Sequence, residues 1–143
     1  MSKLSLDVVT PIGVAFSDSV DSVSVEAIDG ELGILPNHVP LFTAIKIGVL
    51  SYQKDGVTDY VAVMGGFVDV NNNKVSVLSP AAESASSIDA MRAKQDKEDA
   101  ERLLMEKAGD DRFQRAEREA IKSSARLKAV DLLNKSGRGL KRH

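Results

Sequence analysis

The sequence predicts an α+β fold, with an N-terminal antiparallel β-sandwich over residues 1–84 and a C-terminal antiparallel two-helix hairpin over residues 85–135. Helix breakers support this division, because all four prolines and seven of the ten glycines in the 143-residue chain lie before residue 85. Charge supports it too: residues 1–84 carry four lysines and ten acids, a net charge of −6, whereas residues 85–143 carry fifteen basic and eleven acidic residues, a net charge of +4. The hydrophobic periodicity also changes, from about two residues to a helical repeat.

Short alternating segments separated by turn residues predict the strands of the sandwich. Leu4, Leu6 and Val8 begin the pattern, and further strands are expected over residues 20–27, 47–52, 57–63, 67–70 and 75–78. The turns are expected at Asp-Gly, Gly-Gly and Asn-rich positions, which tolerate a positive φ: residues 29–30, 55–56, 65–66 and 71–73. Strands this short and closely spaced favour an antiparallel sandwich or barrel.

The second part has the composition of two helices joined by a short turn. An Ala/Ser-rich stretch marks the boundary, and Ser86 or Ser87 is expected to cap a first helix over about residues 88–107. Gly109 and the two acids that follow it are expected to end that helix and to begin a second one over about residues 112–134.

The apolar stripes of the two helices are narrow and rich in alanine. They comprise Ala93, Ala100, Leu103 and Leu104 in the first helix, and Phe113, Ala116, Ala120, Leu127 and Val130 in the second. Because such stripes bury little apolar area, at roughly 25 cal/mol per Å² the hairpin is expected to be held weakly in any one arrangement. The Gly/Lys/Arg-rich tail, residues 136–143, is expected to be disordered.

Composition excludes several classes of protein. The chain has no cysteine, which rules out disulfides and thiolate metal sites. No apolar run approaches the roughly 18 residues that a membrane-spanning helix needs, and the N-terminus shows no secretion signal. The formal net charge of −2 argues against a general nucleic-acid-binding protein.

The segment from Gly30 to Leu41, GELGILPNHVPL, is the most unusual stretch of the chain. Its glycines, prolines and asparagine specify backbone shape, which favours a rigid loop at the edge of a sheet over a catalytic role. His38 is the only histidine outside the tail, and no catalytic motif supplies a nucleophile or an orienting acid for it. One histidine alone does not form a zinc site.

The start of the first helix carries charged residues that have two interpretations. Asp89 and Arg92 lie three residues apart and share a face. In the first, Asp89 stabilises the start of the helix and forms a weak ion pair with Arg92. In the second, the carboxylate binds a hydroxyl group of a ligand and the guanidinium binds its phosphate. Lys122 and Arg126 on the second helix can add positive charge to the same ligand if the helices are antiparallel. The residues alone favour the first interpretation, a solvated helix surface.

The segments GELGILPNHVPL, GGFVDV and IDAMRA, with Glu83 between the last two, are similar in order and spacing to the epsilon subunits of bacterial F-type ATP synthases. The resemblance extends from Leu4 to Asn134, and GELGILPNH is its most specific part. It implies a β-sandwich with a mobile helical hairpin, in a regulatory subunit that has no catalytic activity of its own.

The resemblance also implies partners. The sandwich is expected to bind the gamma subunit and the ring of membrane rotor subunits (the c-ring), with Glu31 and His38 as ring contacts, and thereby to couple proton flow to ATP synthesis. The hairpin is expected to rise along gamma and to inhibit ATP hydrolysis by meeting acidic segments of the catalytic beta subunits. The basic residues expected to make that contact are Arg115, Arg118, Lys122 and Arg126. Such a subunit lies on the cytoplasmic side of the cell membrane and reaches the membrane only through the complex.

In some members of this family, ATP binds the folded hairpin as a regulatory ligand, without being hydrolysed, through an I/L-D-x-x-R-A motif. The residues that match or accompany the motif here are Glu83, Ile88, Asp89, Arg92, Ala93, Lys122 and Arg126. Tight-binding members have arginine where this chain has Asp99 and Lys122. Because each charge-assisted hydrogen bond contributes about 1.5–3 kcal/mol, ATP is expected to bind weakly or not at all, and no other cofactor is expected.

Two alternatives to a rotor subunit stay open. A free-standing nucleotide sensor predicts a stable solitary protein outside any larger assembly. An enzyme that uses His38 predicts loss of turnover in His38→Ala, but no feature of the sequence identifies its substrate.

Overall fold

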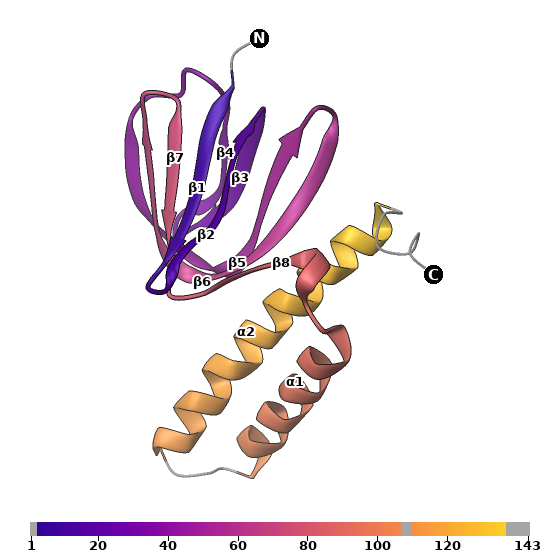
Figure 1. Cartoon of the computed structure of the whole chain (residues 1–143). Coiled ribbons are helices and arrows are strands. Elements are labelled where there is room, and N and C mark those ends of the chain that lie inside the picture. The colour runs from indigo at the N-terminus through magenta and orange to yellow at the C-terminus, as the bar shows by residue number, and fades with distance from the viewer. Residues whose placement is uncertain (1–2, 107–109, 137–143) are drawn as a thin grey trace.

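The computed structural model describes residues 3–106 and 110–136. These residues form eight strands, a short 3-10 turn (η1, Ala85–Ser87) and two helices, α1 (Ala90–Met105) and α2 (Asp110–Lys135) (Figure 1). The strands are β1 (Leu4–Thr10), β2 (Gly13–Val20), β3 (Ser22–Ala27), β4 (Gly30–Ile34), β5 (Leu41–Lys54), β6 (Val57–Asn71), β7 (Lys74–Leu78) and β8 (Ala82–Ser84). This order confirms the predicted fold class. The predicted helix stop at Gly109 and residues 137–143 of the predicted disordered tail lie outside the described residues.

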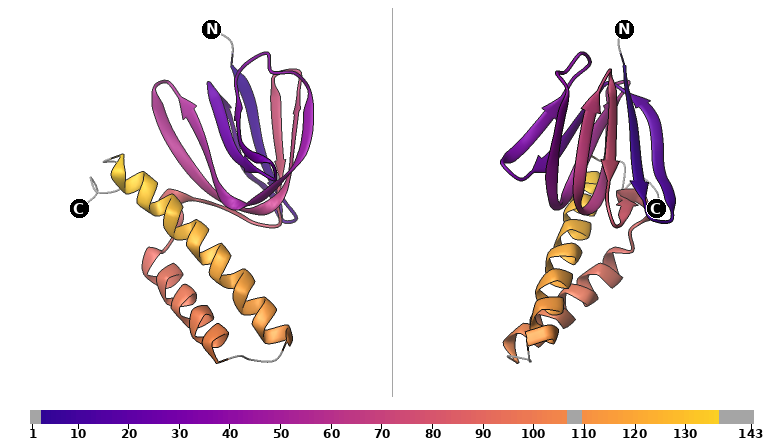
Figure 2. Two further views of the ribbon diagram at one scale, coloured as in Figure 1. Left: turned by 180° about the vertical axis from the view of Figure 1, so that it is seen from behind. Right: turned by 90° about the vertical axis from the view of Figure 1, so that its left-hand side faces the viewer.

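The strands form a hydrogen-bonded sheet, in the order β2-β1-β7-β6-β5-β3-β4, that folds over on itself as a sandwich (Figures 1 and 2). The two longest strands, β5 and β6, take part in both layers. Residues 41–45 of β5 pair with residues 66–70 of β6 in the layer that holds β7, whereas the other halves of both strands pair in the layer that holds β3 and β8. The predicted antiparallel arrangement holds except for β1 and β7, which run parallel.

Gly65 and Gly66 do not form the turn that the sequence predicts, because they lie inside β6. Their φ angles of 80° and 114° let the strand bend from one layer to the other without ending. A Cβ atom on Gly66 would collide with the backbone carbonyl oxygen of Leu78, so the neighbouring strand leaves room only for glycine there. The predicted strands over residues 57–63 and 67–70 are therefore one strand.

The other predicted turns are confirmed. Residues 55–56 join β5 to β6 with φ angles of 52° and 81°, residues 72–73 join β6 to β7 with φ angles of 51° and 60°, and Gly30 follows the β3–β4 turn with a φ of 127°. The sequence pattern does not predict β2, β4, β8 or the first half of β5. β2 and the first half of β5 break the expected alternation because they present apolar side chains to solvent, as Val14 and Phe42 show with more than half of each exposed.

The main core lies between the two layers and consists mostly of valine, leucine and isoleucine. The alternating residues Leu4, Leu6 and Val8 of β1 all point into it and are fully buried, as predicted. Leu50 and Val68 contribute from the two long strands. Because close packing fixes these side chains, the sandwich forms a rigid base for the helices.

The first helix begins at a different residue from the one predicted. Residues 86–87 belong to η1, and Ile88 has an extended backbone with φ −79° and ψ 130°, so neither serine caps α1. The N-cap is Asp89, whose carboxylate accepts a hydrogen bond of 3.1 Å from the backbone N–H of Arg92. The N-cap lies further along the chain than predicted because both serines belong to η1, which ends before α1 begins.

The two helices lie side by side and pack through small side chains (Figures 1 and 2). Ala93 and Ala100 on α1 and Ala116 on α2 are buried, as predicted. The remaining residues predicted for the stripe of α2 are only half-buried or exposed: Phe113, Ala120, Leu127 and Val130. The prediction is incomplete because some buried residues of α2 face α1 and others face the sheet. A single periodic stripe describes a helix with only one buried face.

The C-terminal half of α2 docks on the sandwich through a second, smaller apolar cluster. Ala129 and Leu133 on α2 pack with Val49 of β5 and with Ala62 and Met64 of β6. Because alanine side chains bury little area, this contact stabilises docking less than the main core stabilises the sandwich. The hairpin therefore rests on the sandwich as a separate layer (Figure 1).

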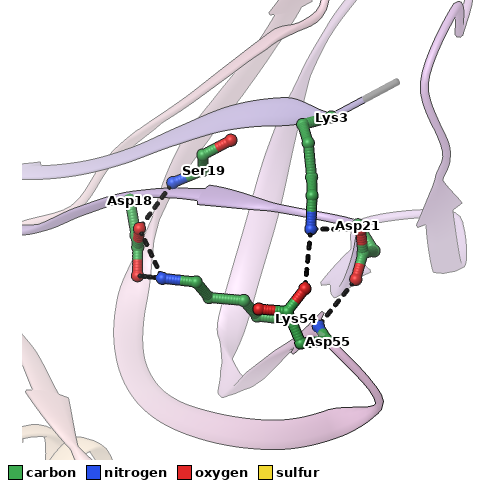
Figure 3. Close-up of polar contacts among 6 residues, drawn as sticks. All are labelled: Lys3, Asp18, Ser19, Asp21, Lys54 and Asp55. Carbon is green, nitrogen blue, oxygen red and sulfur yellow. Dashed lines mark hydrogen bonds and ion pairs between the residues drawn. The ribbon is translucent and has the colours of Figure 1, made fainter. Parts of the chain in front are cut away.

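A group of charged residues ties together strands at one end of the sandwich (Figure 3). Lys3 lies 2.7 Å from Asp21 and 3.1 Å from Asp55, and Lys54 lies 2.9 Å from Asp18.

These contacts shift the pKa values of the charged groups. Hydrogen bonds from Lys54 and from the backbone N–H of Ser19 lower the pKa of Asp18. Hydrogen bonds from Lys3 and from the backbone N–H of Asp55 lower the pKa of Asp21. The hydrogen bonds to Asp21 and Asp55 raise the pKa of Lys3.

The lowered pKa of Asp21 predicts a stability contribution that disappears in acid. The contribution is complete above the unfolded-state pKa of about 3.9 and is lost as the pH falls through the lower folded-state pKa. Asp21→Asn removes the charge, so the urea midpoint of the parent chain should exceed that of the variant at about pH 6 and converge with it at about pH 2. A difference of the same size at both pH values would contradict the assigned ion pair.

Candidate functional site

Six of the seven residues predicted to bind ATP line one pocket, where β8, η1 and the start of α1 meet α2. They are Glu83, Ile88, Asp89, Arg92, Ala93 and Arg126. Asp96 and Glu119 also line this pocket, which has a volume of about 240 Å³. Lys122, the seventh predicted residue, lines a neighbouring groove instead. The fold thus brings six of the predicted residues together as expected. The sequence did not indicate that Asp96 and Glu119 also line this pocket.

Asp89 and Arg92 have separate environments. The carboxylate of Asp89 caps α1, which confirms the prediction of a helix-start acid. The side chain of Arg92 is exposed, and within residues 3–106 and 110–136 it forms no ion pair with Asp89. The guanidinium of Arg92 is therefore accessible to an anion, whereas the carboxylate of Asp89 already has a structural hydrogen bond.

Arg126 connects α2 to the sheet at the base of the pocket. Its Nε donates a hydrogen bond of 2.8 Å to Glu83 of β8, and its Nη1 lies 3.5 Å from Glu119 of α2. Burial opposes the charged form of this largely buried guanidinium, but the hydrogen bond and charge of Glu83, with a smaller effect of Glu119, raise the pKa of Arg126 above its ordinary value. Arg126 therefore stays cationic and already has a carboxylate partner.

A larger groove of about 730 Å³ lies between α1 and α2, next to this pocket. Four basic residues of α2 line it: Arg112, Arg115, Arg118 and Lys122. Asp96 and Asp99 of α1 line it as well, and Asp99 accepts a hydrogen bond of 2.9 Å from Gln95 and lies 3.2 Å from Arg102. The groove therefore carries positive charge from α2 and negative charge from Asp96 and Asp99 of α1 and from Glu119 of α2.

Glu31 and His38 are not brought together. Glu31 is exposed near the start of β4, and His38 lies in the loop that follows the other end of this strand. The loop is well fixed: Asn37 has a φ of 68°, and its backbone N–H donates a hydrogen bond of 2.6 Å to Asn73. The sequence predicts a rigid loop over residues 30–41, but residues 30–34 form β4, and only residues 35–40 form such a loop at the sheet edge.

An apolar stripe that sequence reasoning did not identify crosses the outer face of the sandwich. Phe67 lies opposite Leu78 and stacks on Phe42, with 5.4 Å between the ring centroids. Leu78 also pairs with Val9, which pairs with Val14. Because cross-strand partners point to the same face, these five residues form one stripe. Val9 is half-buried, and the other four residues are between 46% and 63% exposed. An exposed apolar surface of this kind is typical of a protein interface.

Comparison with known proteins places the sandwich and the helices in one family. The family described as "ATP synthase, Delta/Epsilon chain, beta-sandwich domain" matches residues 3–85. The ATP synthase epsilon chain of Symbiobacterium thermophilum is 46% identical over 136 residues, which cover 94% of this chain and 97% of that relative. The chain belongs to the family of ATP synthase epsilon chains. It is therefore an ATP synthase subunit.

Further comparisons agree with this assignment. The epsilon chain of Desulforamulus reducens is 46% identical over 126 residues, which cover 88% of this epsilon chain and 96% of that relative. The epsilon chain of Bacillus mycoides is 41% identical over 132 residues, which cover 92% of this chain and 99% of that relative. A chain in the Euglena gracilis mitochondrial ATP synthase structure with OSCP, F1 and c-ring has the same fold, with a TM-score of 0.67, 19% identity, and coverage of 95% of this chain and 82% of that one. A chain of the Tetrahymena thermophila mitochondrial ATP synthase central stalk and c-ring has a TM-score of 0.58, 15% identity, and coverage of 90% and 97%.

No helix within residues 3–106 and 110–136 combines the length and apolar character needed to cross a membrane. In the same ranges, no group of three or more histidine, cysteine, aspartate or glutamate side chains could hold a metal ion.

The N-cap geometry predicts different effects of two substitutions at Asp89. Asp89→Ala should destabilise the hairpin by about 1 kcal/mol because the backbone N–H of Arg92 loses its acceptor, whereas Asp89→Asn should change it much less because the amide oxygen can still accept. Thermal unfolding followed by the helical circular-dichroism signal compares the two variants with the parent chain. Equal destabilisation by alanine and asparagine would contradict the capping role.

Proposed function

We propose that this epsilon chain is a non-catalytic rotor subunit of the central stalk, which couples proton translocation to ATP synthesis and inhibits ATP hydrolysis with its hairpin. The observation that carries this proposal is the small cluster between α2 and the sheet, formed by Ala129 and Leu133 on Val49, Ala62 and Met64. The further side chains packed against this cluster, among them Ile47, Tyr60 and Leu132, are only partly buried. An arm held by this separate cluster can leave the sandwich without unfolding the main core.

The proposed contact with the gamma subunit uses the apolar stripe of Val9, Val14, Phe42, Phe67 and Leu78. The stripe crosses five neighbouring strands of a rigid layer, and its two stacked phenylalanines offer a large apolar area to a partner. The docked hairpin covers a different part of the sheet, at Val49, Ala62 and Met64, so movement of the hairpin leaves this stripe unchanged.

The proposed contact with the c-ring follows the free edge of β4. This strand ends the sheet order, and its exposed N-terminal part carries Glu31. A surface that includes both Glu31 and His38 has to extend along the length of β4, about 17 Å for five residues at 3.4 Å each. Through this edge the subunit lies on the cytoplasmic side of the cell membrane, as a peripheral part of the complex.

The proposed inhibitory surface is the basic side of α2. Arg115, Arg118 and Lys122 line the open groove between the helices and are available to acidic segments of the beta subunits. Arg126 differs because it is tied to Glu83, so it can reach a beta subunit only after that ion pair breaks. Extension of the hairpin therefore exposes one further cation.

Removal of residues from Ser87 onward tests both parts of this proposal in the assembled ATP synthase. The truncated subunit should still co-purify with gamma and the catalytic subunits because the sandwich keeps its own core, while the rate of ATP hydrolysis should rise. Full-length Arg115→Gln/Arg118→Gln serves as the matched control, since it removes positive charge from the inhibitory surface without uncovering the sheet. Unchanged hydrolysis would overturn the inhibitory role, and loss of assembly would overturn the role of the sandwich.

We also propose that ATP is at most a weak regulatory ligand of the pocket lined by Glu83, Asp89, Arg92 and Arg126. Three of these four groups already have partners, because Asp89 caps α1 and Arg126 pairs with Glu83. The acids Asp96 and Glu119 on the pocket wall repel phosphate. Weak binding follows because a nucleotide has to displace these contacts and face this negative charge.

Calorimetry of the full chain with ATP tests this proposal. Asp99→Arg should strengthen binding about tenfold or more, because it replaces an acid of the adjoining groove by a cation that can form a charge-assisted hydrogen bond with phosphate. Glu101→Arg, an equal change of charge at an exposed position outside both the pocket and this groove, serves as the control. Submicromolar affinity of the unmodified chain would contradict the proposal.

A further inference from the structure

Glu26 of β3 lies at the contact between the sheet and α2, and none of the functions proposed above uses it. Its Oε2 accepts a hydrogen bond of 2.9 Å from the backbone N–H of Val49 on β5. The Nζ of Lys128 on α2 lies 3.5 Å from the same oxygen. One carboxylate oxygen therefore contacts both the sheet and the helix that docks on it.

An irregularity in the pairing of β3 with β5 explains why the carboxylate reaches this position. Ser24 lies opposite Ser51, but Ala27 lies opposite Ile45, so three steps along β3 correspond to six along β5. The additional residues of β5 bulge out of the regular ladder. The side chain of Glu26 bonds the backbone N–H of Val49 within this bulge, which fixes the carboxylate in place.

Gly48 provides the space that this arrangement needs. A Cβ atom at residue 48 would lie 2.5 Å from Oε2 of Glu26, closer than any side-chain carbon can approach. The requirement is one of space, since no positive φ is found at this glycine. A single glycine inside a strand is a sequence signal for such a close approach, although it does not identify the group that approaches.

We propose that Glu26 is a docking point for Lys128, and that this ion pair is a latch that limits how often α2 leaves the sheet. The inference rests on the proposed function, in which the hairpin leaves the sandwich. A second ion pair, Arg126 with Glu83, holds the same stretch of α2. The two carboxylates come from different sides of the β5–β6 pair, since β3 borders β5 and β8 borders β6. The helix is thus held on both sides of the apolar cluster.

The latch responds to ionic strength. The side chain of Lys128 is 58% exposed and that of Glu26 is 33% exposed, so dissolved ions can reach the pair. A pair this exposed makes a small contribution to docking, and it can therefore adjust the hairpin without locking it.

A single cysteine beneath α2 tests the latch in the full chain, which otherwise has no thiol. Met64→Cys places the thiol at a buried position of the sheet that packs in the same cluster as Ala129 and Leu133. An uncharged alkylating reagent then reacts mainly when α2 is detached. Lys128→Gln should increase the labelling rate about two- to fivefold, in the range expected for an exposed ion pair, and Glu26→Gln should do the same while its amide oxygen can still accept from Val49.

Controls separate the latch from general charge effects. Lys97→Gln removes a lysine of α1 that lines one pocket together with Glu26 and Lys128 but is not paired with Glu26, and it should leave the rate unchanged. The Glu26→Gln/Lys128→Gln variant should label no faster than either single variant, because both remove the same interaction. In about 1 M salt, where the screening length is about 3 Å, the parent rate should approach that of Lys128→Gln.

Two outcomes would overturn the latch: equal rates for Lys128→Gln and Lys97→Gln, or fully additive effects of the two substitutions in the pair. Labelling of the isolated chain does not involve ATP hydrolysis. Failure of the latch therefore leaves the truncation test of the inhibitory role valid, and failure of the truncation test leaves these labelling rates interpretable.

Discussion

The contact between α2 and the β5–β6 layer has two components of different kinds. Ala129 and Leu133 bury a small apolar area on the sheet, and two ion pairs flank this area at Glu83 and Glu26. The apolar component is non-directional and weak because alanine offers little surface, whereas the ion pairs fix the position of the helix but are accessible to solvent. Together they allow a docked hairpin that can be displaced, which is the physical requirement of the proposed inhibitory role.

The bends in β5 and β6 create this docking surface. Gly65 and Gly66 carry β6 from one layer to the other, and the bulge of β5 around Gly48 brings the backbone N–H of Val49 to Glu26. Because both long strands cross between layers, one part of the sheet is left for α2 and another for the exposed stripe around Phe67. A partner on the stripe and the hairpin on the sheet therefore do not compete for the same residues.

A buried serine of α2 adds to the weakness of the hairpin. Ser123 is fully buried, and its hydroxyl has no hydrogen-bond partner among the described residues. A buried hydroxyl without a partner costs about 1–3 kcal/mol, and the buried alanines of the two helices, such as Ala93, Ala100 and Ala116, return little of it through burial. A hairpin of this composition is stabilised mainly by its surroundings rather than by its own core.

Sequence patterns predicted the fold class, most turns and the position of the two helices, because these depend on local propensity and on the distribution of proline and glycine. They did not reveal that Gly65 and Gly66 lie inside one strand, since a glycine pair is equally compatible with a turn and with a bend. The family motif identified the pocket around Arg92 and Arg126. The contacts of Glu26 with Val49 and Lys128 could not be predicted, because they join residues far apart in the sequence through an irregular strand pairing.

The position of the hairpin in the assembled ATP synthase tests the central claim most directly. Spin labels on Asn71→Cys and Gln114→Cys, two exposed positions on the sandwich and on α2, allow pulsed electron-spin resonance to measure the distance between the two parts. We expect two separate distance populations, one matching the docked hairpin and one much longer, and we expect their ratio to change with nucleotide conditions. A single population at the docked distance under all conditions would contradict the central claim.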